Sequence, residues 1–154
     1  MITKILVPVD GSEYANKAAD YAVRLAKLMN AKLVVLHVVH LPTYALAYPV
    51  VEGPSPVTLP APLPVSLLED EKKVAGKLVN KVKQMAEKAG VEAETMIIER
   101  HPSVPDAIIE FATKTGSDLI VIGTKGRTGI KRFLLGSVTE SVVHHAHCPV
   151  LVVR

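Results

Sequence analysis

Short apolar runs alternate with longer amphipathic segments along the whole chain. Five runs are expected to be strands: residues 4–9, 31–39, 92–99, 118–123 and 149–153. The runs at 31–39 and 118–123 are apolar almost without interruption, which is typical of strands buried on both faces of a sheet. The pattern therefore predicts a sheet that is covered on both of its faces.

Four segments with apolar residues three and four positions apart are expected to be helices. The first, residues 12–30, has mostly small residues on its inward face: Ala15, Ala18, Ala19, Ala22, Leu25, Ala26 and Met29. The second, residues 66–89, has larger ones before Gly90 ends it: Leu67, Leu68, Val74, Leu78, Val82 and Met85. The third and fourth begin with predicted capping boxes, Ser103 with Asp106 and Ser137 with Glu140.

Strands and helices alternate strictly in this pattern, beginning and ending with a strand. Such an order predicts a single-domain α/β fold over residues 1–154, with an open, doubly wound, five-stranded parallel sheet. Ligands of such sheets bind beyond the carboxyl ends of the strands, where the winding direction reverses. This rule directs attention to Asp10, after the first strand, and to the loop after the fourth.

Composition narrows the classes of function. The chain has a net charge of +3, no Trp and 4% aromatic residues, and its basic residues are scattered, so nucleic-acid binding is not expected. Cys148 is the only cysteine, which excludes an intrachain disulfide. Because no apolar run reaches the length of a membrane span and the amino-terminal run is too short for a signal peptide, a cytoplasmic location is expected.

The segment 41–65 departs from the regular pattern. It contains seven of the eleven prolines and few charged residues, which predicts a long loop between the second strand and the second helix. Its apolar residues favour a lid over the domain or a contact with a protein partner. A disordered linker is the alternative.

The stretch "GTKGRTGIKRFLLGS", residues 123–137, places four of the nine glycines between a strand and a helix. The start of a helix offers unpaired N–H groups to a phosphate, and glycines at 123, 126 and 136 would let a sugar or phosphate approach the backbone. Ser137 and Thr139 could add hydroxyl donors. For the basic residues of the loop, solvated side chains are the alternative, and Asp10 could equally cap or turn the chain before the first helix.

The spacing of this stretch resembles a known signature. Gly123, Gly126, Gly136 and Ser137 fit the pattern G-x2-G-x9-G-[S/T] of the universal stress protein family, in its ATP-binding subclass. The flanking blocks "ILVPVDGS", "LHVV", "LLGSVTESVV" and "CPVLVV" are similar to that family as well. The resemblance covers the whole chain except the proline-rich loop.

The resemblance implies a binding site for ATP, with Mg or Mn bridging its phosphates. It implies adenine near Pro8, Val9 and the backbone of Val38, and ribose at Asp10 and Gly123. The phosphates would lie at Lys125, Gly126, Gly136, Ser137, Val138 and Thr139, and Ile122 completes the expected site. It also implies the strand order 3-2-1-4-5 and a homodimer through the fifth strand, from Pro149 to Val153.

The expected function is therefore an adenine-nucleotide-binding stress or signalling protein that acts as a switch. At most slow ATP hydrolysis is expected, because Asp10 is assigned to the ribose and no second carboxylate stands near the signature until Glu140, which the capping box would engage. The alternative is a protein-interaction module of the same fold that binds cyclic AMP or no nucleotide. A metal site at "HHAHC", residues 144–148, is a weaker hypothesis, since adjacent helical histidines point about 100° apart.

Overall fold

The computed structural model describes residues 1–40, 65–125 and 135–154. Its strands are β1 (Lys4–Pro8), β2 (Lys32–His40), β3 (Ala93–His101), β4 (Leu119–Gly123) and β5 (Val150–Val153). Its helices are α1 (Glu13–Met29), α2 (Val65–Lys88), α3 (Val104–Thr115) and α4 (Ser137–His145). All nine elements were predicted from the sequence. The proline-rich loop and Gly126 lie outside the described residues.

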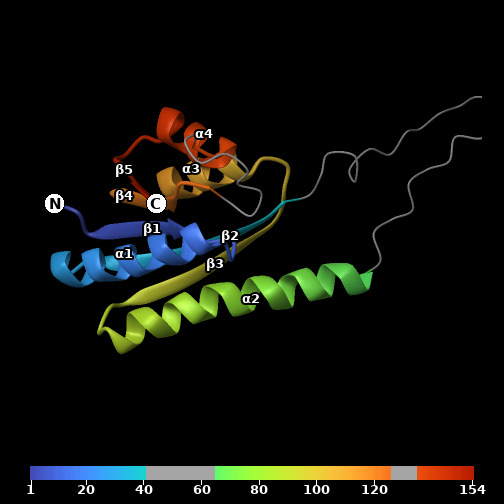
Figure 1. Ribbon diagram of the computed structural model, residues 1–154, viewed down its shortest axis with the longest axis horizontal. Helices are drawn as coiled ribbons and strands as arrows, with labels where there is room; N and C mark the ends of the chain where they lie inside the picture. Colours follow the sequence, from blue (N-terminus) through green and yellow to red (C-terminus); the bar gives the residue numbers. More distant parts are fainter. Residues whose placement is uncertain (41–64, 126–134) are drawn as a thin grey trace, which may run out of the picture.

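The five strands form one parallel sheet in the order β3-β2-β1-β4-β5. The predicted strand order is thus confirmed. Successive connections run outward from β1 to β3 and then return to β4, so the winding direction reverses between β1 and β4 (Figure 1). The switch point of the sheet therefore lies at the carboxyl ends of these two central strands.

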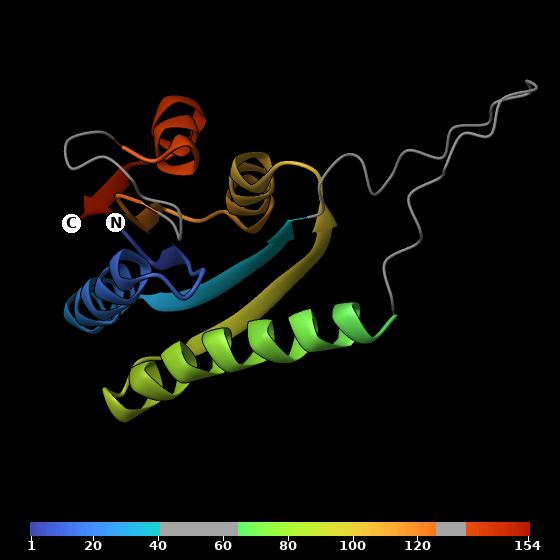
Figure 2. The same cartoon turned by 45° about the vertical axis from the view of Figure 1, so that its right-hand side comes forward.

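Two helices cover each face of the sheet (Figures 1 and 2). Helices α1 and α2 pack on one face, where alanines of α1 meet alternate residues of β1 and β2 such as Val7 and Val35. Helices α3 and α4 pack on the other face, against residues such as Leu6 and Leu36. The alternation of strand side chains thus divides the interior into two apolar layers.

Two residues predicted to face inward are exposed. Met29, the last residue of α1, is 42% exposed, and Val74 of α2 is 50% exposed. The buried face of α2 is instead built mainly from small residues: Ala75, Val79, Val82 and Ala86. Leu67 and Leu68 lie outside the described side chains. Because one helical position turns the side chain by 100°, burial of Ala75 carries the adjacent Val74 toward solvent.

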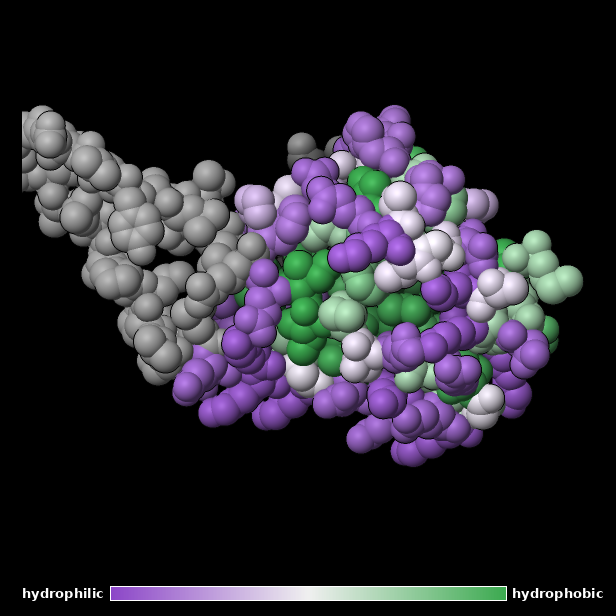
Figure 3. All heavy atoms as spheres, turned by 180° about the vertical axis from the view of Figure 1, so that it is seen from behind, coloured by the Kyte–Doolittle hydropathy of each residue, from purple (hydrophilic) through white to green (hydrophobic). Residues whose placement is uncertain are grey.

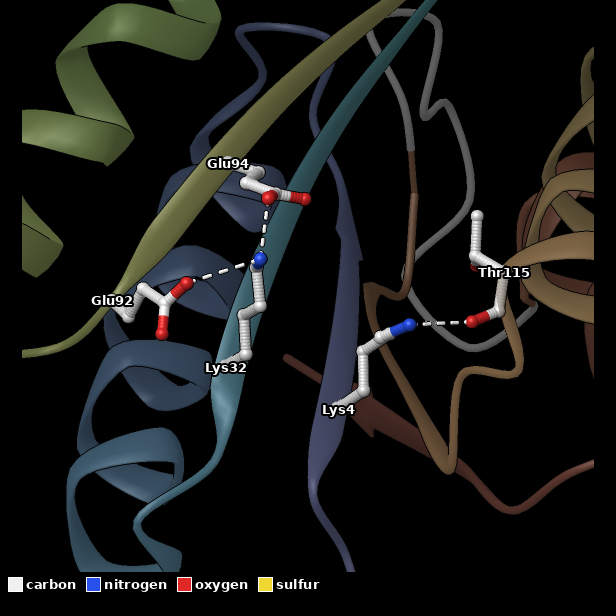
Figure 4. Close-up of polar contacts among 5 residues, drawn as sticks. All are labelled: Lys4, Lys32, Glu92, Glu94 and Thr115. Atoms are coloured by element: carbon white, nitrogen blue, oxygen red, sulfur yellow. Dashed lines mark hydrogen bonds and ion pairs between the residues drawn. The ribbon is translucent and has the colours of Figure 1, made fainter.

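Polar contacts fasten the amino ends of the strands (Figure 4). The ammonium group of Lys32 contacts the carboxylates of Glu92, at 3.1 Å, and Glu94, so it joins β2 to β3. Lys4 donates to the carbonyl of Thr115, 2.6 Å away, and joins β1 to the end of α3. These contacts all lie at the end of the sheet opposite its switch point.

Asp118 makes a second fastening at the same end. Its Oδ2 accepts hydrogen bonds from the N–H and hydroxyl of Thr3, both at 2.8 Å, and from the N–H of Lys4, at 2.9 Å. Its own N–H donates to the Lys4 carbonyl at 2.9 Å. We call this group the Asp118 latch, because it joins the starts of β1 and β4.

The face seen in Figure 3 has apolar patches between its polar residues. Each edge strand of the sheet has an exposed apolar side chain: Met96 of β3 is 42% exposed and Leu151 of β5 is 37% exposed. No helix in the described part of the chain combines the length and the apolar character needed to cross a membrane.

Candidate functional site

A cleft lies at the switch point of the sheet, on the face that carries α3 and α4. The space inside it, open solvent at its mouth included, is about 510 Å³. Its lining comes from both halves of the chain: Pro8, Val9, Asp10, Ala15, Leu36, Val38, Val104, Ile108, Ile122, Gly123, Lys125, Val138 and Thr139. Most of these residues are apolar, and the polar side chains of the lining are Asp10, Lys125 and Thr139.

The structure brings most of the predicted site residues together. Nine of them line the cleft: Pro8, Val9, Asp10, Val38, Ile122, Gly123, Lys125, Val138 and Thr139. Gly136 and Ser137 lie at the start of α4, beside this lining and outside it. Four lining residues were not predicted: Ala15, Leu36, Val104 and Ile108. The side-chain periodicity could have indicated three of them, because Leu36 lies two positions before Val38 on the same strand and Val104 lies four before Ile108 on the same helix.

The chain makes a polar turn as it leaves β1. Oδ1 of Asp10 accepts the N–H of Ser12 at 2.9 Å, and the hydroxyl of Ser12 accepts the N–H of Ala15 at 3.2 Å. Ser12 is therefore the N-cap of α1, and Asp10 is the turn residue before it. The Ser12 hydroxyl also lies 3.4 Å from the carbonyl of Lys125, where the loops after β1 and β4 meet.

Gly123 has a different task from the one expected of it. A Cβ at this position would lie 2.7 Å from the carbonyl carbon of Tyr14 and 2.9 Å from the nitrogen of Ala15. The glycine therefore permits close packing of α1 on β4, and the prediction that its missing side chain makes room for a ligand is wrong. Its backbone still lines the cleft, and its carbonyl accepts the hydroxyl of Thr139 at 2.7 Å.

The start of α4 also differs from the expected capping box. Gly136 is the N-cap, no side chain caps the helix, and Ser137 is the first helical residue. Gly136 donates its N–H to the carbonyl of Thr124 at 2.8 Å, which fixes the approach to the helix. Glycine is one of the residues accepted at this position, and here it caps the helix without a side-chain hydrogen bond.

This geometry leaves three backbone donors at the start of α4. The first helical hydrogen bond runs from the N–H of Glu140 to Gly136, at 2.9 Å, so the N–H groups of residues 137–139 have no helical acceptor. The hydroxyl of Thr139 is buried and donates to Gly123, so the expectation that it donates to a ligand is wrong. Such donors, with the helix dipole and with Lys125 in the same cleft lining, are groups that could hold an anion.

The histidines near the end of α4 have ordinary structural partners. Nδ1 of His145 lies 2.9 Å from the Ser141 carbonyl, and Nδ1 of His147 lies 3.0 Å from the Thr113 hydroxyl. No cluster of three or more His, Cys, Asp or Glu that could hold a metal occurs in residues 1–40, 65–125 and 135–154. Burial raises the pKa of the Cys148 thiol, which lowers its reactivity.

Comparison with known proteins places the chain among relatives of similar length. The sequence model of the universal stress protein family matches residues 1–154. A universal stress protein of Methanocaldococcus jannaschii is 41% identical over 152 residues, covering 98% of this chain and 81% of that protein.

Solved structures agree in fold. The universal stress protein UspA from Lactobacillus plantarum is 33% identical with a TM-score of 0.80, and the match covers 99% of this chain and 98% of that one. A universal stress protein solved in complex with cyclic AMP is 26% identical with a TM-score of 0.69, covering 99% and 97%. The signature at the switch point, the strand order and the match over the full chain agree: the chain belongs to the universal stress protein family.

Proposed function

We propose that this protein binds ATP in the cleft at the switch point and acts as a nucleotide-dependent stress or signalling switch. The observation that carries the proposal is the combination of an apolar cleft with the three N–H groups of residues 137–139, which have no helical acceptor at the start of α4. The solved relative in complex with cyclic AMP supports an adenine nucleotide as the class of ligand.

The apolar part of the cleft suits a planar base. Its lining there is apolar and comes from three elements: Leu36 and Val38 of β2, Val104 and Ile108 of α3, and Ile122 of β4. Burial of an aromatic base against such side chains contributes about 25 cal/mol per Å² of apolar surface removed from water. The proposed adenine site is therefore this slot, with the backbone of Val38 at its edge.

The polar rim suits the remainder of a nucleotide. We assign the ribose hydroxyls to Asp10 and to the backbone of Gly123, both of which line the cleft. The phosphates would lie on the N–H groups of residues 137–139, with Lys125 beside them. Gly136 contributes by shaping the start of α4, since its own N–H already donates to Thr124. The contribution of Gly126, outside the described residues, stays a prediction.

A divalent ion would come with the nucleotide. Among the described residues, Asp10 is the one carboxylate of the cleft lining, so protein side chains alone do not form a cage for Mg²⁺ or Mn²⁺. Mg²⁺ commonly binds through substrate phosphates and waters, and such an ion would neutralise phosphate charge. With no second carboxylate lining the described cleft to position a water, we expect at most slow hydrolysis.

Two assembly proposals follow from the same family resemblance. Strand β5 is an edge strand with exposed apolar surface, so it can pair with β5 of a second copy to form a homodimer. A contact between the proline-rich loop and a protein partner also stays a prediction, because that loop lies outside the described residues.

Calorimetry on nucleotide-free protein tests the binding site. Wild type is titrated with ATP, AMP and cyclic AMP, and we expect ATP to bind most tightly because its phosphates reach the start of α4. The absence of binding by any of the three would make the proposal wrong. Tightest binding of cyclic AMP would favour the alternative of a cyclic-nucleotide module.

A matched pair at Ser137 tests the phosphate site. Ser137 is the first residue of α4, a position at which proline is well tolerated, and Gly136 has the extended backbone (φ −68°, ψ 152°) that precedes proline. Ser137→Pro removes one backbone donor, and we expect a loss of about tenfold in ATP affinity. Ser137→Ala keeps that donor and is the control. Equal ATP affinity in the two variants would contradict the placement of phosphate at this helix.

A further inference from the structure

His37 is a buried polar residue beside the cleft that the proposed function does not use. It lies on β2 and is 8% exposed, and its Nδ1 lies 2.7 Å from the carbonyl oxygen of Val9. A carbonyl oxygen has no proton to give, so Nδ1 carries the hydrogen and donates. The imidazole thus donates a hydrogen bond to the Val9 carbonyl, at the point where the chain leaves β1.

This hydrogen bond interrupts the ladder between β1 and β2. Even-numbered residues of β2 turn their backbone groups toward β1: the N–H of Lys32 donates to Thr3 at 2.8 Å, and the carbonyl of Leu36 accepts from Val9 at 2.8 Å. If the parallel ladder continued, the N–H of Val38 would donate to the Val9 carbonyl. The side chain of His37 occupies that carbonyl instead.

The interruption leaves a donor and an acceptor side by side at the edge of the cleft. By the same alternation, the N–H and carbonyl of Val38 point toward the space beyond the end of β1, and Val38 lines the cleft. Neither group has a backbone partner among the described residues. The N–H and carbonyl of Val9, by contrast, are both taken, so Val9 can contact a base only by packing.

We propose that His37 is a positioning residue that holds the Val9 carbonyl and so keeps the Val38 backbone open to read the edge of a base. The inference rests on the proposed function. A neighbouring donor and acceptor match N1 and the 6-amino group of adenine, which accept and donate in that order. Hypoxanthine and guanine present a donor at N1 and an acceptor at position 6, so the same backbone rejects them.

Loss of the imidazole donor changes both affinity and base choice. Without it, the buried Val9 carbonyl needs another donor, and the Val38 N–H is the nearest one in a continued ladder. In His37→Leu the Val38 N–H would therefore donate to the Val9 carbonyl and would no longer be available to the base. His37→Asn keeps an amide N–H at the position of Nδ1 and leaves the edge open.

The experiment compares ATP with ITP, whose base is hypoxanthine, by calorimetry on four proteins. These are wild type, His37→Leu, His37→Asn and, as a control, His145→Ala, which alters an exposed histidine of α4. We expect wild type, His37→Asn and His145→Ala to prefer ATP by about tenfold or more, and His37→Leu to lose about tenfold in ATP affinity with little change for ITP. General damage to the fold would weaken both nucleotides alike and preserve their ratio.

The outcomes separate this inference from the proposed function. An unchanged ATP to ITP ratio in His37→Leu would overturn the role of His37 while nucleotide binding stands. Failure of wild type to bind either nucleotide would overturn the proposed function and the inference with it.

Hydrogen exchange of the Val38 amide gives a second measurement that does not depend on the folding of His37→Leu. In wild type without nucleotide this amide should exchange fast, and ATP should slow it. Protection of the Val38 amide before any nucleotide is added would overturn the inference.

Discussion

Gly123 and Gly136, at the two ends of the switch-point loop, have different structural roles. Gly123 is needed because α1 passes its backbone so closely that a methyl group would overlap Tyr14. Gly136 caps α4 through its backbone and bonds back to Thr124. A glycine in a sequence signals that something lies close, but it does not say whether that neighbour is a ligand or another part of the chain. The sequence could therefore locate these residues and could not assign Gly123.

Replacement of Gly123 should destabilise the fold. In Gly123→Ala the new methyl group meets backbone atoms that cannot rotate away, so α1 must shift, at a cost of about 1–3 kcal/mol in the free energy of unfolding. Gly76→Ala is the matched control, because nothing lies within 4 Å of its Cβ position on α2. That change should stabilise the helix by up to about 1 kcal/mol. Thermal unfolding of both variants checks the pair, and equal melting temperatures would contradict the close packing.

The elements themselves could largely be predicted, because burial repeats with a different period in strands and helices. The buried face of a helix was harder to predict where that face consists of small residues. The burial of Ala75 and Ala86 in α2 leaves a weak apolar signal, and the stronger signal of Val74 belongs to an exposed position. The caps at Ser12 and Ser103 followed the local rule, whereas α4 begins with a glycine cap set by a contact to Thr124 that the local sequence does not reveal.

At the level of elements, the Asp118 latch links stability to pH. The N–H of Thr3, its hydroxyl and the N–H of Lys4 all donate to the carboxylate and hold the pKa of Asp118 below its ordinary value of 3.8. A carboxyl whose pKa is lowered by folding stabilises the fold above its ordinary pKa. The contribution disappears as the pH falls through the lowered value and the group takes up a proton.

Asp118→Asn should remove this pH dependence. At neutral pH the variant should have a lower free energy of unfolding than wild type, and the gap should narrow as the pH falls below 3.8. Urea unfolding at a series of pH values measures both proteins. A gap that stays constant across the acidic range would show that the charge of Asp118 does not act in the latch.

For the whole molecule, the open edge at β5 determines how copies can assemble. The carbonyl of Pro149, just before β5, accepts the N–H of Ile120 in β4 at 3.0 Å, and the carbonyl of Val153 accepts the N–H of Thr124, just after β4, at 2.8 Å. Odd-numbered residues along β5 therefore turn their backbone groups inward. Val150 and Val152 therefore turn theirs outward, away from β4, where a second copy would pair in the proposed dimer. A substitution at an outward position can thus test that pairing without breaking a hydrogen bond to β4.

Val152→Pro should yield monomers with little damage to the sheet, since it removes an outward N–H and proline is accepted in edge strands. Leu151→Pro is the contrasting variant, because it removes an inward donor and should lower the melting temperature. Light scattering and circular dichroism distinguish the two effects. A dimer that persists in a folded Val152→Pro protein would place the interface elsewhere.

The polar fastenings at Lys4, Lys32 and Asp118 lie at one end of the sheet, and the cleft lies at the other. The residues that join the strands at this end and the residues that line the cleft are therefore largely separate, but Gly123 belongs to the cleft lining and also sets the packing of α1 on β4. Substitutions at the far end can change the resistance of the fold to heat while the cleft lining stays as it is, whereas a substitution at Gly123 affects both.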